Sequence, residues 1–208
     1  MSKNPLEDSN ILGELFTAIS QKLTITLYYH TFKAKEARLS VNLYPYLLKE
    51  YNRRWFLIAA AESDGKLLTF SLDRIDDVKP LSSHKYAEYE GDINEIYEDI
   101  IGITYKEESP VYKILFWVSN MSADYVATKP LHESQRNIGS AHETELRSQF
   151  PQLIEGRFFL IECKENYELI RELTSFGKDL VVLSPSPITG MVEKRISDMN
   201  EIYSDLRK

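Results

Sequence analysis

The chain has 208 residues, of which 43% are hydrophobic, enough for one large domain or two small ones with ordinary cores. Its formal net charge of −7 argues against a nonspecific nucleic-acid-binding protein, whose surface is usually basic. No run of about 18 apolar residues is present, and the N-terminus lacks the apolar segment of a signal peptide. The single cysteine, Cys163, cannot form an internal disulfide, so we expect a cytoplasmic protein without a membrane span.

The charge is unevenly distributed along the chain. Residues 23–85 hold ten Lys and Arg against seven Asp and Glu, a balance of +3. Residues 86–110 hold eight acidic side chains against Lys106, a balance of −7. The sequence therefore predicts a locally basic module followed by an acidic connector, and the connector is interpreted as a solvated segment.

The first half of the chain predicts a short helix followed by closely spaced strands. Segment 1–22 is interpreted as a linker with a short helix, because its apolar residues follow helical spacing. They are Leu12, Leu15, Phe16 and Ile19, and Leu23 continues the spacing just after the segment. Strands are predicted at 23–29, 39–43, 55–61 and 66–72, with Asp64-Gly65 as the turn between the last two. Short strands at this density favour a small barrel or a strongly curled sheet.

The second half alternates strands and helices. Strands are predicted at 114–118, 157–163 and 180–183, and a helical turn at 123–128. Periodicity is weak in 132–152. Asn166 is expected to cap a helix that ends at Gly177, and Ser186-Pro187 is expected to begin a helix with an apolar stripe up to Leu206. A β-α-β unit with a closing helix indicates a ferredoxin-like α+β domain.

Several motifs in the two halves of the chain form a pattern. The first half carries Tyr29, Pro45, Arg54-Trp55-Phe56-Leu57 and Leu72-Asp73-Arg74-Ile75, and the second half carries Pro130-Leu131-His132 and the segment 166–185. Together they resemble the WYL domain and the extension that follows it in bacterial regulators, with Phe56 where the family has tyrosine. The resemblance implies an α+β protein: a small Sm-like or SH3-like β-barrel, with the connector, over 23–109, and a ferredoxin-like extension over 110–208.

Eight residues form the predicted ligand site. Guanidinium groups bind phosphate in a bidentate manner, and aromatic rings offer surfaces on which bases stack. The residues are Tyr29, Tyr44, Arg53, Arg54, Trp55, Ser71, Asp73 and Arg74. Strand alternation sends Arg53 and Arg54 to opposite faces, so only one of them is expected to meet the ligand. Trp55 is better explained as a core ring, because an apolar strand follows it, whereas Asp73-Arg74 is equally well explained as a structural ion pair.

Two positions depart from the pattern of the family. Many relatives have an arginine four residues before the proline, where this chain has Val41, and a histidine directly before it, where this chain has Tyr44. Both replacements remove a basic group from the neighbourhood of the predicted site. They leave open whether the anion affinity and the ligand are those of the relatives.

The resemblance implies the ligand-sensing module of a bacterial transcriptional regulator. Its ligand would be nucleic acid, single-stranded by analogy with relatives, or a nucleotide-like anion. Such regulators usually begin with a helix-turn-helix, which this sequence lacks, so duplex DNA would be bound through a missing N-terminal domain. The extension would supply the contacts of a homodimer.

A different class of function remains open beside it. The alternative is a non-catalytic oligomerisation or protein-interaction module whose arginines only brace the barrel. The two hypotheses differ in whether Arg54 and Arg74 reach solvent in one concavity or are each held by a carboxylate such as Asp73.

Catalytic and metal-binding motifs are missing from the sequence. The eight glycines are scattered, and no phosphate-binding loop, serine elbow or cysteine pair occurs. His132 and His142 with Glu143 are the only plausible metal or base cluster, and they lack a defined ligand spacing. We therefore expect no enzymatic activity, no metal and no cofactor.

Overall fold

The computed structural model describes residues 10–31 and 38–207. Residues 1–9, which include part of the predicted linker segment, lie outside the described residues. The chain divides into two compact units, Met1–Glu95 and Ile96–Lys208, and each is described by itself. The division falls inside the acidic connector, so that segment contributes residues to both units. Helices combine with antiparallel sheets, which confirms the α+β class.

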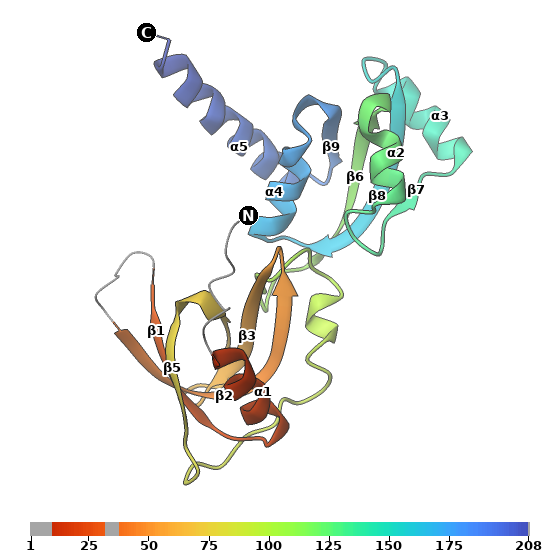
Figure 1. The fold of residues 1–208 in the computed structure, drawn as a ribbon. Helices are drawn as coiled ribbons and strands as arrows, with labels where there is room; N and C mark the ends of the chain where they lie inside the picture. Colours follow the sequence, from red (N-terminus) through yellow and green to blue (C-terminus); the bar gives the residue numbers. More distant parts are fainter. Residues whose placement is uncertain (1–9, 32–37, 208) are drawn as a thin grey trace. The chain divides into compact units, whose positions relative to one another are not determined.

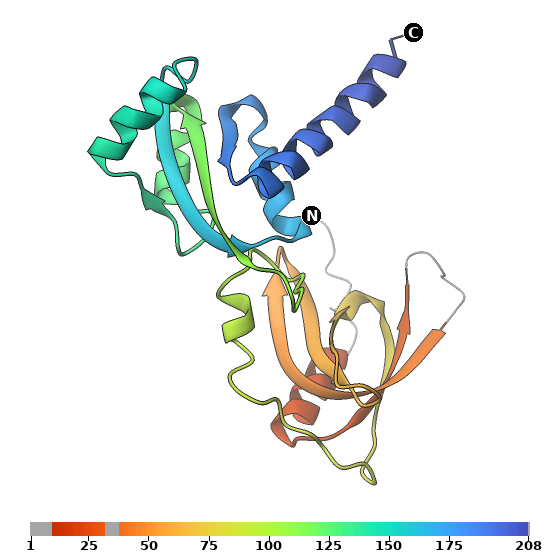
Figure 2. The same cartoon turned by 180° about the vertical axis from the view of Figure 1, so that it is seen from behind.

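The first unit is one helix on a five-stranded antiparallel sheet. Its elements are α1 (Ile11–Ser20), β1 (Ile25–His30), β2 (Arg38–Tyr51), β3 (Arg54–Ala61), β4 (Leu67–Ser71), the 3₁₀ turn η1 (Leu72–Arg74) and β5 (Ile75–Pro80). The strand order is β4-β3-β2-β1-β5. Figures 1 and 2 show β2 and β3 as long, strongly curved strands. The predicted curled sheet is thus confirmed, whereas its closure into a barrel stays a prediction.

The core of the first unit follows the predicted alternation. Ile25, Leu27 and Tyr29 of β1 are buried on one face, and Ile25 pairs with the buried Leu43 of β2. Helix α1 contributes Ile11, Leu15 and Ala18, a four-three spacing that defines a narrow apolar stripe. Phe16 lies beside this stripe and is 66% exposed, so the prediction that it faces the domain was wrong.

Two strands differ from their predicted extent. Strand β2 runs for 14 residues instead of five, because a register shift between Pro45 and Leu47 lets the chain pass a proline and continue pairing with β3. Strand β5 was not predicted. Only Ile75 and Val78 are buried in it, a spacing of three that does not resemble a half-buried strand.

The second unit has a four-stranded antiparallel sheet with helices on both faces. The 3₁₀ turn η2 (Glu95–Tyr97) spans the division between the units. The remaining elements are β6 (Val111–Ser119), α2 (Asn120–Thr128), β7 (Arg136–Asn137), α3 (Ser140–Gln149), β8 (Gly156–Lys164), α4 (Tyr167–Ser175), the 3₁₀ turn η3 (Gly177–Asp179), β9 (Leu180–Ser184) and α5 (Ser186–Asp205). The strand order β7-β8-β6-β9, with α2 and α4 as crossovers, is the ferredoxin-like order predicted from the sequence.

Helix α3 is an insertion into this order. It lies between β7 and β8, in the segment where the sequence shows weak periodicity, and only Leu146 of the helix is buried. Leu146 packs with Trp117 and Phe158 on one face of the sheet. The opposite face carries the main core, in which Phe116 and Phe159 stack with ring centroids 5.7 Å apart beneath α2 and α4.

The predicted helix signals of the second unit are confirmed. The Asn166 side chain accepts a hydrogen bond from the Leu169 backbone N–H at 2.8 Å and caps α4. Its amide group donates to the carbonyls of Ile101 and Thr104, which attaches the end of the acidic connector to α4. Gly177 takes a left-handed φ of 58° after the helix, the conformation that favours glycine.

Candidate ligand-binding site

Five of the eight predicted site residues come together at one end of the first unit's sheet. Tyr29 lies near the end of β1, and β1 pairs with β5 through Tyr29 and Ile75, directly after η1. Ser71 ends β4, and Asp73 and Arg74 belong to η1. Arg54 begins β3 and reaches Asp73. We call these residues the arginine cluster: Tyr29, Arg54, Ser71, Asp73 and Arg74.

Tyr29 and Arg74 form the inner part of the arginine cluster. The guanidinium carbon of Arg74 lies 5.0 Å from the Tyr29 ring centroid, a cation–π contact. The ring also meets Phe70 edge-on at 5.1 Å, which fixes it in the core. Burial raises the pKa of the Tyr29 hydroxyl, and the positive charge of Arg74 offsets part of that rise. The planar guanidinium is therefore held against a rigid aromatic surface.

Arg54 and Asp73 form the outer part. Arg54 Nη1 lies 3.6 Å from Asp73 Oδ2, beyond hydrogen-bond distance, and the Arg54 side chain is 58% exposed. Asp73 is only 17% exposed and accepts a hydrogen bond from the Ser71 hydroxyl through its other oxygen, Oδ1. Asp73 is thus oriented by Ser71 and attracts Arg54 only loosely. Neither of the two predicted extremes applies to Arg54, because it is paired with a carboxylate and still accessible.

Arg53 lies outside the arginine cluster, in a turn. Tyr51 pairs with Arg54, and the two residues between them, Asn52 and Arg53, have φ angles of 49° and 62°. Two positive φ angles in a two-residue connection define a type I′ hairpin turn. The prediction that Arg53 alternates with Arg54 along a strand was wrong, because Arg53 precedes the strand. Asn52, which tolerates this conformation, was the sequence signal for the turn.

Trp55 packs into the core, and Tyr44 lies on the face of the sheet opposite Tyr29. Trp55 is partly buried and packs against the core of the first unit, as the alternative interpretation of this residue expected. Tyr44 follows the buried Leu43 in β2, so strand alternation turns it to the face opposite Tyr29.

Comparison with known proteins assigns the first unit to a family. The family model described as the WYL domain matches residues 10–80, the segment that contains all eight predicted site residues. The chain contains a WYL domain. A search of curated proteins finds no match to this chain.

Two solved structures are similar in fold. One is a CRISPR Cas-related protein, 16% identical with a TM-score of 0.52; the alignment covers 96% of this chain and 53% of that one. The other is proteasome accessory factor B/C of Arthrobacter aurescens, 12% identical with a TM-score of 0.38, covering 92% of this chain and 26% of that one. This chain therefore spans about half and about a quarter of their lengths.

A group of four tyrosines outside the arginine cluster joins the WYL domain to the connector that follows it. Tyr44 and Tyr46 meet the Tyr86 ring at 5.9 and 6.1 Å, and Tyr46 meets Tyr89 at 5.7 Å. The Tyr86 hydroxyl donates to the Pro45 carbonyl at 2.7 Å, next to the register shift in β2. Burial, followed by the proximity of Tyr46 and Glu88, raises the pKa of Tyr86 to about 12. These contacts explain Tyr44 by packing, and the sequence analysis missed Tyr46, Tyr86 and Tyr89.

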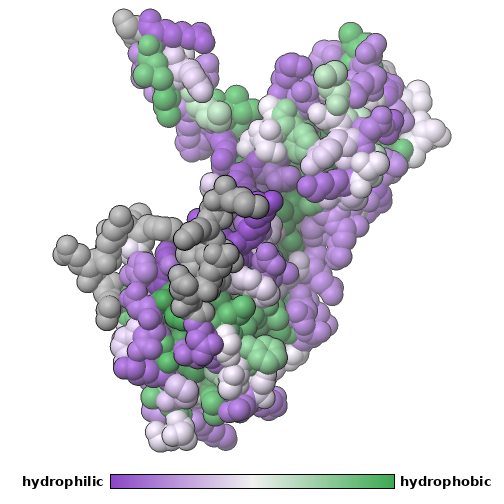
Figure 3. Space-filling model, in the orientation of Figure 1, coloured by the Kyte–Doolittle hydropathy of each residue, from purple (hydrophilic) through white to green (hydrophobic). Residues whose placement is uncertain are grey.

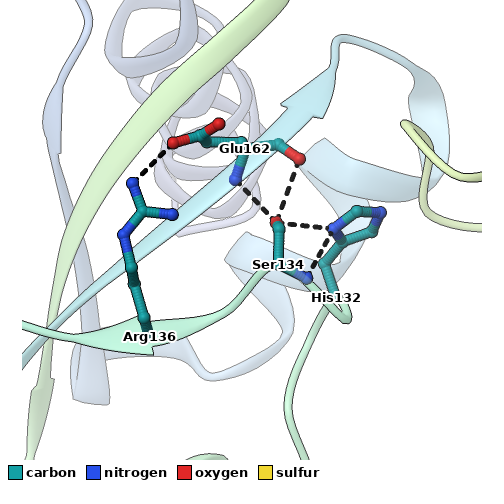
Figure 4. Close-up of polar contacts among 4 residues, drawn as sticks. All are labelled: His132, Ser134, Arg136 and Glu162. Carbon is teal, nitrogen blue, oxygen red and sulfur yellow. Dashed lines mark hydrogen bonds and ion pairs between the residues drawn. The ribbon is translucent and has the colours of Figure 1, made fainter.

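In the second unit, the Pro130-Leu131-His132 motif builds a buried turn. Figure 4 shows Ser134 between His132 and the β8 backbone. Its hydroxyl lies 2.7 Å from His132 Nδ1, accepts from the Glu162 N–H at 2.8 Å and can donate to the Glu162 carbonyl at 3.0 Å. The Ser134 N–H also points at His132 Nδ1, at 3.3 Å. This contact favours a tautomer in which Nδ1 carries no proton and accepts the hydrogen bond. His132 is 9% exposed, which favours a structural role over contact with a partner.

The remaining chemical groups give no support to a metal or membrane role. His142 is exposed on α3 whereas His132 is buried, and no group of three potential metal ligands occurs within residues 10–31 and 38–207. The Cys163 thiol is buried, which raises its pKa to about 12 and makes it a poor nucleophile. Of the helices that the structure describes, none combines the length and the apolar character needed to cross a bilayer.

Proposed function

We propose that this chain is the ligand-sensing module of a transcriptional regulator, and that its arginine cluster binds the phosphates of a single-stranded nucleic acid or of a nucleotide-like anion. The WYL domain supports a regulatory, non-catalytic role. The observation that carries the proposal is the arginine cluster itself. It combines a guanidinium fixed on an aromatic ring with a second one that is loosely paired and accessible.

The two arginines suit different parts of such a ligand. Arg54 can exchange its distant partner, Asp73, for a phosphate that accepts two parallel hydrogen bonds at shorter range. Arg74, stacked on Tyr29, adds positive charge behind it at a fixed position. The likeness to a CRISPR Cas-related protein concerns the fold alone. The nucleic-acid ligand is therefore argued from the arginines and from the family resemblance.

The wider assembly is also part of the proposal. Duplex DNA would be bound by a helix-turn-helix domain outside this chain, and occupancy of the WYL domain would change that binding. The chain would act in the cytoplasm as a homodimer. Binding of a ligand can shift such an equilibrium only through a difference in affinity between the two states of the regulator.

One observation favours the second candidate function, a protein-interaction module. Arg54 is paired with Asp73, and an arginine that serves to close a sheet would have such a partner. In that case the arginine cluster would stabilise the unit and bind no anion. On removal of the Arg54 charge, the first candidate predicts weaker binding of the ligand, and the second predicts lower stability without a change in binding.

The test is fluorescence anisotropy of labelled single-stranded DNA, single-stranded RNA and duplex DNA over a salt series. Wild-type protein is expected to bind a single strand with an affinity that falls as salt rises. In a plot of the logarithm of the association constant against the logarithm of the salt concentration, each phosphate contact should contribute a slope of about −0.7. The Arg54→Ala variant should bind roughly tenfold or more weakly, because charge-assisted hydrogen bonds are worth about 1.5–3 kcal/mol.

The matched control is Lys66→Ala, which removes a cation paired with Asp64 at the β3–β4 turn. Its affinity should equal that of the wild type. If both variants bind alike, or if no oligonucleotide binds at low salt, the nucleic-acid proposal fails. An Arg54→Ala variant that unfolds more easily without any change in binding would favour the interaction module.

A further inference from the structure

Helix α5 carries an apolar stripe that the second unit does not cover. The helix spans 20 residues, but only Ile188 and Val192, near its beginning, are buried. Figure 1 shows the later turns extending past α4 and β9, and Figure 3 shows hydrophobic side chains along one side of the extension. Five large apolar side chains there are 52–77% exposed: Ile196, Met199, Ile202, Tyr203 and Leu206. A contiguous exposed stripe of this kind indicates an interaction surface.

The spacing of the stripe is that of a coiled coil. Ile196, Met199, Tyr203 and Leu206 recur at intervals of three, four and three residues, which are the a and d positions of a heptad. Ile202 lies directly beside them, at a g position. An a/d seam suits a second helix better than the flat surface of a sheet, and Ile202 widens this seam on one side.

We propose that the second copy of this chain covers the stripe, through two α5 helices that pair antiparallel about a twofold axis beside Ile202. In this register Ile196 packs against the partner's Leu206, and Met199 packs against the partner's Tyr203. Ile202 meets the partner's Ile202 next to the axis. All five exposed apolar side chains are then buried, and the same patch serves on both copies, as a twofold interface requires.

The charges along the helix select the antiparallel direction. Glu193 and Asn200 lie at e positions of α5, on the other side of the stripe from Ile202, and Arg207 follows at the same seven-residue interval, two residues after the helix ends at Asp205. In the antiparallel register Asn200 meets its own copy, and Glu193 meets the partner's Arg207 on both sides of the axis. All three residues are exposed in the single chain, so their side chains can make these contacts.

A parallel pair would not use these charges. Its e positions face g positions, so Arg207 would lie beside the partner's Ile202 and Glu193 beside the partner's Ile188. Neither contact joins opposite charges, and the first sets a guanidinium against an apolar side chain. With Arg207 just beyond its end, α5 is therefore better matched in charge to an antiparallel copy than to a parallel one. This inference deepens the homodimer of the proposed function and does not depend on the arginine cluster.

The experiment is sedimentation equilibrium of the whole chain as wild type, as Glu193→Arg, as Arg207→Glu and as an equimolar mixture of the two variants. Each variant alone carries two like-charged pairs in its homodimer, so its dimer dissociation constant should rise roughly tenfold. In the mixture each heterodimer regains two attractive pairs, because one chain is then basic at both positions and the other acidic. Dimerisation should return to the wild-type level.

A second pair of variants tests the apolar seam. Ile202→Glu places two carboxylates side by side near the axis and should weaken the dimer by roughly 100-fold or more. Ser197→Glu adds the same charge on the outer side of the helix and should leave the dissociation constant within about twofold. Circular dichroism of both variants checks that α5 remains helical, so a loss of dimer reports on the interface.

The outcomes separate this inference from the proposed function. A wild-type dimer that Ile202→Glu and the single charge variants leave intact overturns the α5 interface and keeps a homodimer through another surface. A wild-type monomer overturns both the interface and the homodimer. Neither result touches the oligonucleotide binding of the arginine cluster, which is measured by anisotropy. Weakening by each charge variant with recovery in the mixture supports the interface.

Discussion

The two units each contain an arginine–carboxylate pair, and the pairs differ in how tightly they are closed. In the WYL domain Arg54 Nη1 lies 3.6 Å from Asp73 Oδ2, whereas in the second unit Arg136 Nη2 lies 2.5 Å from Glu162 Oε1. The arginines are similarly exposed, at 58% and 51%. The difference therefore lies in the geometry of each pair and in what surrounds the carboxylate.

One carboxylate oxygen of Asp73 accepts a hydrogen bond from Ser71, whereas the carboxylate of Glu162 accepts one from Arg136. The hydrogen bond from Arg136 holds the pKa of Glu162 below its ordinary value. The Glu162 backbone is fixed at the same time by Ser134, within the buried turn that contains His132. The two pairs therefore differ in what they leave accessible. The closed pair, Arg136–Glu162, joins β7 to β8, and the open pair, Arg54–Asp73, leaves a guanidinium able to accept another anion.

The largest expected effect is on the closed side. Ser134→Ala removes the hydroxyl that contacts His132 and the β8 backbone, and leaves the Glu162 N–H without its partner. We expect the second unit to lose about 1–3 kcal/mol of unfolding free energy. Hydrogen exchange of the β8 amides measures this loss directly. Ser148→Ala on the exposed side of α3 is the control, and equal protection in both variants would show that the turn contributes nothing.

A smaller effect of opposite sign is expected on the open side. Asp73→Asn removes the charge that competes with a phosphate for Arg54, while the amide oxygen can still accept from Ser71. Affinity for single-stranded DNA should rise about three- to tenfold, since an exposed pair of this kind is worth up to about 1 kcal/mol. Anisotropy titration measures the change. Weaker binding by Asp73→Asn would mean that Asp73 positions Arg54 for the ligand instead of competing for it.

The smallest effect is the pH dependence of the closed pair. A carboxyl whose pKa is lowered in the folded state stabilises the fold above its ordinary value of 4.5, and this contribution is lost as the pH falls through the lowered value. Acidification below 4.5 should therefore destabilise wild-type protein more steeply than Arg136→Gln. Thermal denaturation over a pH series checks this. Parallel curves for the two proteins would contradict a contribution from this pair.

Much of the fold could be predicted because single residues encode it. Asp64-Gly65, Asn166 and Pro187 each mark a turn or a helix start by their own backbone preference or side-chain bond. Helix α3 and strand β5 bury one and two residues respectively, so their apolar patterns are too sparse to show a period.

The grouping of the residues in the arginine cluster was predictable in part for the same reason. Leu72-Asp73-Arg74-Ile75 and the strand that ends near Tyr29 are local patterns, and the structure brings them together through the pairing of β1 with β5. Arg53 was wrongly predicted to lie on a strand. The turn that contains it has two positive φ angles, and its second position holds arginine instead of the glycine that usually marks such a turn in a sequence. The place of Tyr44 on the face opposite Tyr29 could have been predicted by counting one residue on from the inward Leu43.

The most direct test of the difference between the open and the closed pair uses Arg54→Ala and Arg136→Ala. Each variant is assayed for its affinity for single-stranded DNA and for the hydrogen-exchange protection of both sheets. The open pair predicts that Arg54→Ala loses roughly tenfold or more in affinity and leaves the protection of the first sheet nearly unchanged. The closed pair predicts that Arg136→Ala lowers protection in β7 and β8 and binds like the wild type. Equal losses of affinity in both variants, or a loss of protection without a loss of affinity in Arg54→Ala, would contradict the account.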